Sequence, residues 1–360
     1  MPHAKVHRLA TSSPDDVSGL AAGIASGTIV PEGIVAILGK TEGNGCVNDF
    51  TRAFAVQSLK AELGRHLPAA SVERVAYVMS GGTEGALSPH LLVLERGAGQ
   101  SGASPALAIG SALTENLPPQ SLGRREQVEM VARGVRAAIA DAGLTDPADV
   151  HFVQIKCPLL TAERIQAAEA EGYSVTTRDT LKSMGFSRGA SALGVGVALG
   201  EIDISSIDDS SIGRDMSRWS SRASTSAGVE LVNHEIVVLG MSQDWSGPLA
   251  VDHAVMADAI DVNPVRAALG RLGIADDTSS LVALLAKAEP GTSGRLRGSR
   301  HTMLDDSDIS ATRHARAFVG GVLAGLVGMS EIFVSGGAEH QGPDGGGPVA
   351  LIATRRGASL

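Results

Sequence analysis

The chain of 360 residues has only two cysteines and few aromatic residues, and its apolar segments are short. Cys46 and Cys157 cannot build a disulfide framework and do not have metal-ligand spacing. The longest apolar region, residues 21–38, is interrupted by Gly, Ser, Thr, Pro and Glu, which argues against a membrane-spanning helix. No apolar signal core follows the first residues. We therefore expect a cytoplasmic protein in a reducing compartment, with no membrane partner.

Basic runs are also lacking. The formal net charge is −9, so nucleic acid is not an expected partner. Hydrophobic residues make up 43% and charged residues 19%, as in a globular protein with an ample core. Because aromatic residues are few, much of the apolar content is Ala, Val, Leu and Ile. That composition favours parallel or barrel-like strands with closely packed helices.

The sequence does contain one short phrase written three times. Ser-small-Gly-x-Glu occurs at residues 80–84, 226–230 and 335–339. Upstream of each copy an apolar run ends in a lysine, and an arginine lies between that lysine and the serine. The ordered sets are Lys40, Arg52 and Ser80, then Lys156, Arg188 and Ser226, then Lys287, Arg316 and Ser335. A repeat of roughly a hundred residues is a whole supersecondary unit rather than a solenoid turn.

Each copy predicts a strand, a helix and a second strand, a pattern that favours an α/β fold. Asn48 and Asp49 are candidate N-caps for the helix that carries Arg52. The helix that carries Arg188 is expected to open at Ser187, and a longer helix is expected at 123–142. We place three repeat units at residues 1–102, 106–246 and 251–360, with small-residue linkers at 96–104 and 242–248.

The repeated residue types suggest a chemistry. A serine hydroxyl needs a base before it can attack a carbonyl carbon. None of the ten histidines recurs beside the serine phrases, whereas the lysines do. A lysine acts as a base only when burial and nearby positive charge bring its pKa well below the usual value of about 10.4. Three lysines and three arginines around one cavity would supply that repulsion, and the N–H groups of the glycines could bind an oxyanion. Such a pocket suits a flat ring that carries three carbonyl groups.

Simpler interpretations exist for any single copy. A Ser-Gly-Gly after a strand is usually a tight turn, and a lysine that ends a strand is usually a solvated tip. Three ordered copies of the whole set favour function over both. The glutamates that end the phrases, Glu84, Glu230 and Glu339, either support the cations or only cap and form salt bridges. The sequence leaves these two alternatives open.

Two other motifs are rejected. The segment from Gly33 to Thr41 resembles a phosphate-binding loop, but its spacing is one residue too long and its middle is a predicted strand. Cys157 follows Lys156 and could be interpreted as a nucleophile. It occurs in one copy only and has no histidine partner, so a small buried residue is the better interpretation.

Several long segments resemble the cyanuric acid hydrolase/barbiturase family, and the likeness covers essentially the whole chain. They are residues 39–49, 78–85, 152–160, 187–194 and 334–343. The resemblance implies three similar units around a pseudo-threefold axis, with a barrel-like strand core, outer helices and an active site where the units meet. It also implies a hydrolase acting on C–N bonds of cyclic amides. That enzyme would open the s-triazine ring of cyanuric acid to carboxybiuret, which loses carbon dioxide to give biuret.

The resemblance also implies residue roles. Lys156 would be the general base and Ser226 the nucleophile. The substrate would be bound by Arg52, Ser80, Gly81, Arg188, Ser226, Ala227, Arg316, Ser335, Gly336, Lys40 and Lys287. The residues alone do not choose among the three serines, although Ala227 marks the second copy as different where the other copies have glycine.

A structural metal ion and a homotetramer are further implications of the family. Glu289 would be the carboxylate ligand, and backbone carbonyls would come from Ala338, Gln341, Gly342, Pro343 and Gly346. Oxygen ligands alone favour Mg²⁺ or Ca²⁺, and no organic cofactor is expected. Without the family, a glycine-rich turn that binds no metal would be the simpler interpretation.

Rival functions remain at this point. Barbiturase has the same architecture and opens a pyrimidine ring in place of the triazine. A binding protein of another class would capture an anionic ring in the cationic pocket without turnover. Substitution of Ser226 separates these classes, because an enzyme loses turnover whereas a binder keeps its affinity.

Overall fold

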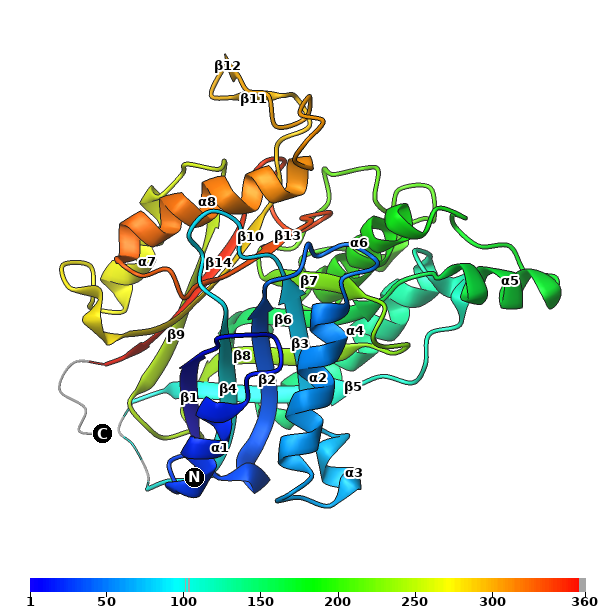
Figure 1. Ribbon diagram of the computed structural model, residues 1–360. Helices are drawn as coiled ribbons and strands as arrows, with labels where there is room; N and C mark the ends of the chain where they lie inside the picture. Colours follow the sequence, from blue (N-terminus) through cyan, green and yellow to red (C-terminus); the bar gives the residue numbers. More distant parts are fainter. Residues whose placement is uncertain (101, 103, 356–360) are drawn as a thin grey trace.

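The computed structural model describes residues 1–100, 102 and 104–355, which form strands β1–β14 and helices α1–α8 (Figure 1). Residues 101 and 103 of the predicted first linker, and 356–360 of the predicted third unit, lie outside the described residues. None of the described helices is long and apolar enough to span a membrane.

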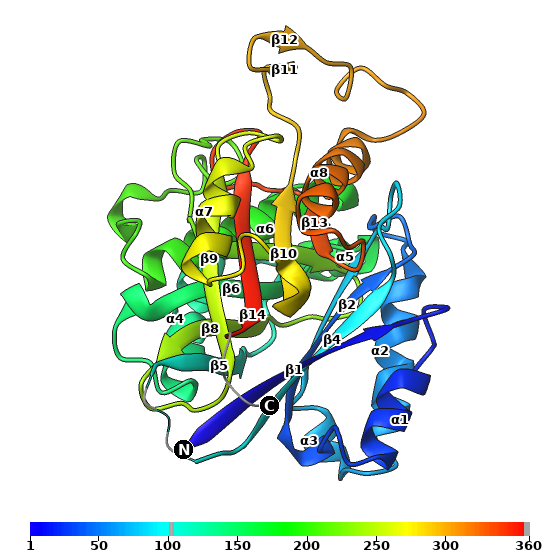
Figure 2. The same ribbon diagram turned by 90° about the vertical axis from the view of Figure 1, so that its left-hand side faces the viewer.

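Twelve of the strands form three four-stranded sheets, each from one stretch of the chain. The first sheet contains β1 (Pro2–Ala10), β2 (Ile34–Thr41), β3 (Ala76–Gly81) and β4 (His90–Ala98). The second contains β5 (Ala106–Leu113), β6 (Val150–Pro158), β7 (Ala223–Gly228) and β8 (Glu235–Ser242). The third contains β9 (Leu249–Met256), β10 (Leu281–Ala288), β13 (Phe333–Gly336) and β14 (Gly347–Thr354). A small hairpin of β11 (Arg295–Leu296) and β12 (Ser299–Arg300) extends from the body of the molecule (Figures 1 and 2).

The three sheets share one strand order. Their orders are β1-β4-β2-β3, β5-β8-β6-β7 and β9-β14-β10-β13. In each sheet the second strand runs parallel to the third, and the fourth strand is antiparallel to both of its neighbours. The predicted α/β class is therefore confirmed. A helix connects each parallel pair, as parallel strands require a long crossover.

Helices pack against each sheet and connect its strands. They are α1 (Ser18–Ala25), α2 (Phe50–Leu63), α3 (Ala69–Val72), α4 (Arg125–Asp141), α5 (Ala162–Ala170), α6 (Thr180–Ala198), α7 (Asn263–Arg271) and α8 (Ala311–Val327). In the first sheet α2 contacts β2 and β3, in the second α4 and α6 contact the strands, and in the third α7 and α8 do so. Figure 2 shows α1, α2 and α3 gathered beside the first sheet.

The helix starts test the sequence predictions. The carboxylate of Asp49 accepts a hydrogen bond from the backbone N–H of Thr51, so of the two predicted candidates, Asn48 and Asp49, the second is the N-cap of α2. The predicted helix at 123–142 is confirmed as α4. The predicted start at Ser187 is wrong, because Asp179 caps α6 and the helix begins at Thr180, seven residues before Ser187. Likewise, β4 continues to Ala98, inside the predicted linker, because it stays paired with β1 up to that residue.

One apolar core joins the three sheets. It contains Leu38 of the first sheet, Phe152 and Ile155 of the second, and Leu285 and Phe333 of the third, all essentially buried. The first and third units each have a further core between their own sheet and helices. The sheets therefore pack on one another through side chains.

The expected barrel-like strand core is wrong. The described strands form open sheets, and none of these closes into a barrel. At the inner edge of the first sheet, β3 contacts β6 and β8, and at that of the third, β13 contacts β2 and β7. The edge strands meet their neighbours through side chains, so backbone hydrogen bonds do not continue from sheet to sheet. This leaves edge carbonyl and N–H groups that need side-chain partners.

Candidate active site

Strand register brings each lysine beside its serine. In the parallel pairs, Lys40 lies opposite Ser80, Lys156 opposite Ser226 and Lys287 opposite Ser335. Each lysine is at or near the end of a buried second strand, and each serine is near the end of the inner edge strand. The three pairs of the repeated phrase are thus equivalent in register as well as in sequence.

Each lysine also reaches across to the next sheet. Nζ of Lys156 donates to the carbonyl of Met79 at 2.6 Å, and Nζ of Lys287 donates to the carbonyl of Thr225 at 2.8 Å. Nζ of Lys40 completes the cycle by donating to the carbonyl of Val334 at 2.7 Å. All three carbonyls belong to the residue just before a repeated serine. The lysines therefore satisfy the free edges of β3, β7 and β13 and hold the three sheets together at the serines.

The serine hydroxyls make a different set of contacts in each copy. Nζ of Lys40 lies 3.4 Å from Oγ of Ser80, and Nζ of Lys287 lies 3.1 Å from Oγ of Ser335. Oγ of Ser226 is hydrogen-bonded to Oγ of Ser335 at 2.8 Å. Among the described residues, no hydrogen bond joins Lys156 to Ser226. The second copy is therefore unlike the other two.

The arginines pair with the glutamates of the repeated phrase, again across sheets. Arg188 donates to Glu339 from Nε at 2.8 Å and from a terminal nitrogen at 2.6 Å. Arg316 is bound to Glu84 in the same bidentate way, with its Nε at 2.8 Å. These partly buried glutamates form salt bridges that hold the arginines in place, which fits both alternatives that the sequence left open.

Glu230 differs from Glu84 and Glu339 because one of its cationic partners is a lysine of the repeated set. Its carboxylate lies 2.8 Å from Nζ of Lys156 and 3.4 Å from Nε of Arg52, so two cations share it. The terminal nitrogens of Arg52 instead donate to the backbone carbonyls of Gly45 and Cys46. Lys156 is thereby the one lysine of the three with an ion pair among the described residues.

Burial and neighbouring charges shift the pKa values of the three lysines. Burial lowers the pKa of Lys156, Glu230 raises it, and Arg52 lowers it, with a net fall. Burial and then Arg316 lower the pKa of Lys40 well below its usual range. Burial and then Arg188 lower the pKa of Lys287 to about 7. A buried amine with a lowered pKa can be neutral and accept a proton, as the sequence argument required.

These residues surround one small cavity. Its lining consists of Gly45, Arg52, Ser80, Gly81, Lys156, Met184, Arg188, Ser226, Ala227, Arg316, Ser335 and Gly336. The predicted residues are thus brought together, apart from Lys40 and Lys287, which lie behind the serines that they contact. Met184 and Gly45 were not predicted. Met184 precedes Arg188 by four residues on α6, so helical spacing could have indicated it.

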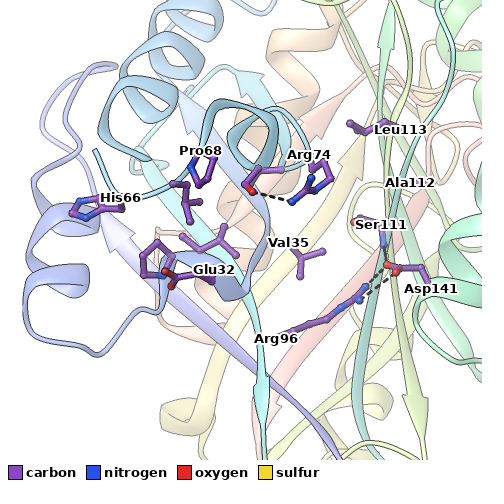
Figure 3. A pocket seen from close by; sticks show the side chains of 15 residues that line it. Glu32, Val35, His66, Pro68, Arg74, Arg96, Ser111, Ala112, Leu113 and Asp141 are labelled. Carbon is purple, nitrogen blue, oxygen red and sulfur yellow. Dashed lines mark hydrogen bonds and ion pairs between the residues drawn. The ribbon is translucent and has the colours of Figure 1, made fainter. Parts of the chain in front are cut away.

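A larger cavity of about 660 Å³ lies elsewhere, between the first and second sheets. Figure 3 shows Glu32, His66 and Arg74 around it, with Arg96 and Asp141 joined as an ion pair. None of the repeated lysines, arginines or serines lines it. The cavity is therefore separate from the candidate active site.

Glu289 and the loop after β13 form the predicted metal region. The Glu289 carboxylate accepts hydrogen bonds from the Thr312 hydroxyl at 2.9 Å and the Gly337 N–H at 2.7 Å. Burial, and then the charge of Glu339, raise the pKa of Glu289. A hard cation beside this buried carboxylate would compensate its charge, and the loop offers backbone carbonyls. The donor set thus fits Mg²⁺ or Ca²⁺.

Comparison with known proteins gives one consistent result. A model of the family described as amidohydrolase ring-opening protein matches residues 5–354. The cyanuric acid amidohydrolase of Azorhizobium caulinodans is 66% identical over 356 residues, which cover 99% of each chain. The enzyme of that name from Bradyrhizobium sp. is 64% identical over 364 residues, which cover 98% of each chain.

Solved structures agree with the sequences. The crystal structure of cyanuric acid hydrolase from A. caulinodans matches with a TM-score of 0.95 and 65% identity, covering 99% of this chain and 100% of that chain. A second solved cyanuric acid hydrolase, described as an innovation by structural concatenation, has a TM-score of 0.95 and 49% identity. That match covers 98% of this chain and 100% of the other.

Proposed function

This chain belongs to the family of amidohydrolase ring-opening proteins and is an amidohydrolase, and we propose that it opens the s-triazine ring of cyanuric acid. The observation that carries the proposal is the convergence of three serines, three arginines and Lys156 on one cavity. The cyclic contacts of the lysines and arginines across the three sheets support a pseudo-threefold axis through this cavity. We also propose that the repeat units are residues 1–102, 106–246 and 251–360.

The cavity chemistry matches a ring with three carbonyl groups. Each wall offers one serine hydroxyl and one guanidinium group, and an arginine donates well to carbonyl oxygens. The cavity holds only about 20 Å³, about the room of one water molecule, so lining side chains must shift when a ring enters. Arg52 lacks a bidentate carboxylate partner among the described residues, and its Nε has no hydrogen bond. The side chain of Arg52 can therefore turn toward the substrate without breaking a bidentate ion pair.

In the proposed reaction, Oγ of Ser226 attacks one ring carbonyl carbon while Nζ of Lys156 accepts the hydroxyl proton. The ring C–N bond then breaks, and the leaving nitrogen takes that proton. Water attacks the acyl group on Ser226 and gives a proton to Lys156. Cleavage of the bond between Oγ of Ser226 and the carbonyl carbon releases carboxybiuret, and Oγ takes the proton back from Lys156. Carboxybiuret then loses carbon dioxide to give biuret. The lowered pKa of Lys156 supports the role of base. Since Lys156 is the register partner of Ser226, a side-chain rotation away from Met79 would join them.

Glu289 would hold a structural divalent cation, together with the carbonyls of Ala338, Gln341, Gly342, Pro343 and Gly346. Such an ion would neutralise a buried carboxylate close to the Arg188–Glu339 pair and fix the loop that follows Ser335. We further propose a homotetramer that works in the cytoplasm, on the basis of family resemblance and of the composition.

The first test is a parallel assay of the purified protein with cyanuric acid and barbituric acid, following ring absorbance and identifying products. Loss of cyanuric acid with formation of biuret is the expected result. Turnover of barbituric acid alone would assign the alternative function, barbiturase, to the same site. Binding of either ring without turnover would leave a binding protein.

Substitutions assign the roles within the site. We expect Ser226→Ala and Lys156→Ala to abolish turnover, because they remove the nucleophile and the base. Ser80→Ala is the matched control on an equivalent wall, and should weaken substrate binding and orientation while leaving measurable turnover. Full activity in Ser226→Ala would refute the assignment of the nucleophile.

A further inference from the structure

Three metal-ligating atoms converge where the second and third sheets meet, away from the serines. His151 is the second residue of β6, and Asp252 and His253 lie on β9, one of the two edge strands of the third sheet. Nδ1 of His151 and Nδ1 of His253 are 3.0 Å apart, and Oδ1 of Asp252 is 3.5 Å from Nδ1 of His151. All three ligand atoms lie within 4.8 Å of one another.

These atoms are mainly electron-pair donors at neutral pH. Burial, and then the charge of His151, lower the pKa of His253 to about 4, so its ring is neutral. Burial raises the pKa of Asp252, but hydrogen bonds from His151 and Arg271 lower it by more than burial raises it. The net pKa is below its usual value, so the carboxylate is ionised. Two ring nitrogens therefore face each other beside a carboxylate oxygen. Without a cation, one ring must carry its proton on Nδ1 to avoid repulsion between lone pairs.

The distances suit one tetrahedral ion. With metal–ligand distances of about 2.0–2.1 Å, neighbouring ligands in a tetrahedral zinc site lie about 3.3 Å apart. The observed separations of 3.0 and 3.5 Å lie on either side of this value. Two imidazoles and one carboxylate suit Zn²⁺ and related transition metals, whereas Mg²⁺ and Ca²⁺ prefer oxygen ligands alone.

The residues around the three side chains leave room for a fourth ligand and fix the orientation of Asp252. A cavity of about 410 Å³ is lined by His151, Asp252 and Arg271, so a water molecule has space to act as fourth ligand. Arg271 donates to Oδ2 of Asp252 at 2.6 Å and to Oδ1 at 3.1 Å, which fixes the carboxylate as outer-shell partners do. The charges of Arg271 and Arg222 oppose a cation, but Arg222 is itself paired with Glu201 at 3.1 Å. The site is therefore suited to a strongly coordinating ion and not to a weakly bound one.

We propose that His151, Asp252 and His253 bind one divalent transition-metal ion of the zinc class, with water in the fourth position. The ion joins β6 of the second sheet to β9 of the third. His151 lies five residues before Lys156 on one strand, a separation of about 16 Å. The ion therefore stabilises the junction of two sheets and takes no part in turnover.

The test uses the full chain, stripped of metal with a chelator and then kept in excess Mg²⁺ to fill any oxygen-ligand site. Calorimetric titration with Zn²⁺ should show one ion bound per chain. Titration with Co²⁺ should give the visible absorption of a tetrahedral nitrogen–oxygen site. Zn²⁺ should raise the melting temperature and leave the turnover of cyanuric acid unchanged, so the result is independent of the proposed function.

Substitutions of the proposed ligands test which residues bind the ion. His151→Ala and His253→Gln should each weaken Zn²⁺ binding by at least about a hundredfold, because loss of a direct ligand costs more than the roughly 10- to 100-fold typical of an outer-shell partner. Both variants should abolish the thermal shift. His66→Ala is the matched control, because His66 also contacts a carboxylate, that of Glu62 at 3.3 Å, but belongs to no three-ligand group among the described residues. Circular dichroism must show that the variants are folded. Absence of Zn²⁺ binding by the wild type, or equal binding by folded His151→Ala and His253→Gln, would overturn the proposal.

Discussion

Single residues distinguish one wall of the candidate active site from the other two. Glu84 and Glu339 each form a bidentate pair with one arginine, and Glu84 also binds Arg313, whereas Glu230 is shared by Arg52 and the lysine Lys156. Glu230 acts against burial by raising the pKa of Lys156. The base and its neighbouring arginine are thus coupled through one carboxylate, and this arrangement occurs only in the second copy among the described residues.

Glu230→Gln should therefore change catalysis in a particular direction. Loss of the negative charge lowers the pKa of Lys156 further, so the acid limb of the kcat–pH profile should move to lower pH. The weaker base should reduce kcat by about ten- to a hundredfold. The measurement is kcat and KM for ring opening as a function of pH.

Glu84→Gln is the control, because Glu84 holds Arg316 but does not contact Lys156. It should raise KM and leave the acid limb in place. If the two variants give the same pH profile, Glu230 does not act through Lys156 and its role is structural.

At the scale of strands and loops, steric crowding explains why a glycine follows the first repeated serine, Ser80. A Cβ on Gly81 would lie 2.0 Å from Oδ2 of Asp49 and 2.7 Å from the backbone nitrogen of Gly45. Asp49 caps α2, and Gly45 accepts a hydrogen bond from Arg52. The glycine therefore allows the capping loop of α2 to reach the end of β3.

We expect Gly81→Ala to displace that loop, lower the melting temperature and raise KM by about tenfold, because Arg52 loses its support. The stability cost should be about 1–3 kcal/mol, as for other overpacked sites. Ala227→Gly is the converse control in the second copy, where a Cβ is already accommodated. Thermal unfolding and steady-state kinetics would measure both, and a neutral Gly81→Ala would contradict the geometry.

Strand β8 carries a pH-dependent contribution to stability. Glu235 lies opposite Lys156 in register and accepts a hydrogen bond from the edge N–H of Tyr77 at 2.7 Å. Burial raises the pKa of Glu235 from 4.5 to about 8, with smaller effects of Lys156, Glu230 and Lys60. Between these two pH values the folded state holds a proton that the unfolded state has lost. Stability should therefore fall as pH rises through this window.

Glu235→Gln should remove this pH dependence while keeping an acceptor for Tyr77. The free energy of unfolding of the variant, relative to wild type, should rise with pH by up to about 1.4 kcal/mol per pH unit between about pH 5 and 8. Urea unfolding at several pH values measures it. The exposed Glu32→Gln serves as control and should show no such trend, and a flat difference for Glu235→Gln would exclude the buried neutral carboxyl.

At the scale of the whole molecule, the sequence predicted the α/β class and the convergence of the lysines and serines. It could do so because register follows directly from buried runs that end at matched positions. The partners of the arginines could not be predicted, since Arg188 and Glu339 belong to different sheets and are 151 residues apart. The start of α6 was missed because Asp179 caps it ahead of a glycine-containing stretch. The prediction of a barrel-like strand core was wrong because lysine side chains, and not backbone pairing, bind the edge strands of neighbouring sheets.

Because one apolar core joins all three sheets, the chain should unfold as a single cooperative unit. Leu38, Phe152 and Leu285 come from different sheets and share this core. A fragment of residues 1–102 would keep its own helix–sheet core but expose the apolar face that normally packs on the other sheets. We expect calorimetry of the whole chain to show one transition whose calorimetric and van't Hoff enthalpies agree. The fragment alone should aggregate or bind a hydrophobic dye. Separate transitions, or a stable soluble fragment with native-like near-ultraviolet circular dichroism, would show that the units fold independently and only afterwards assemble the site.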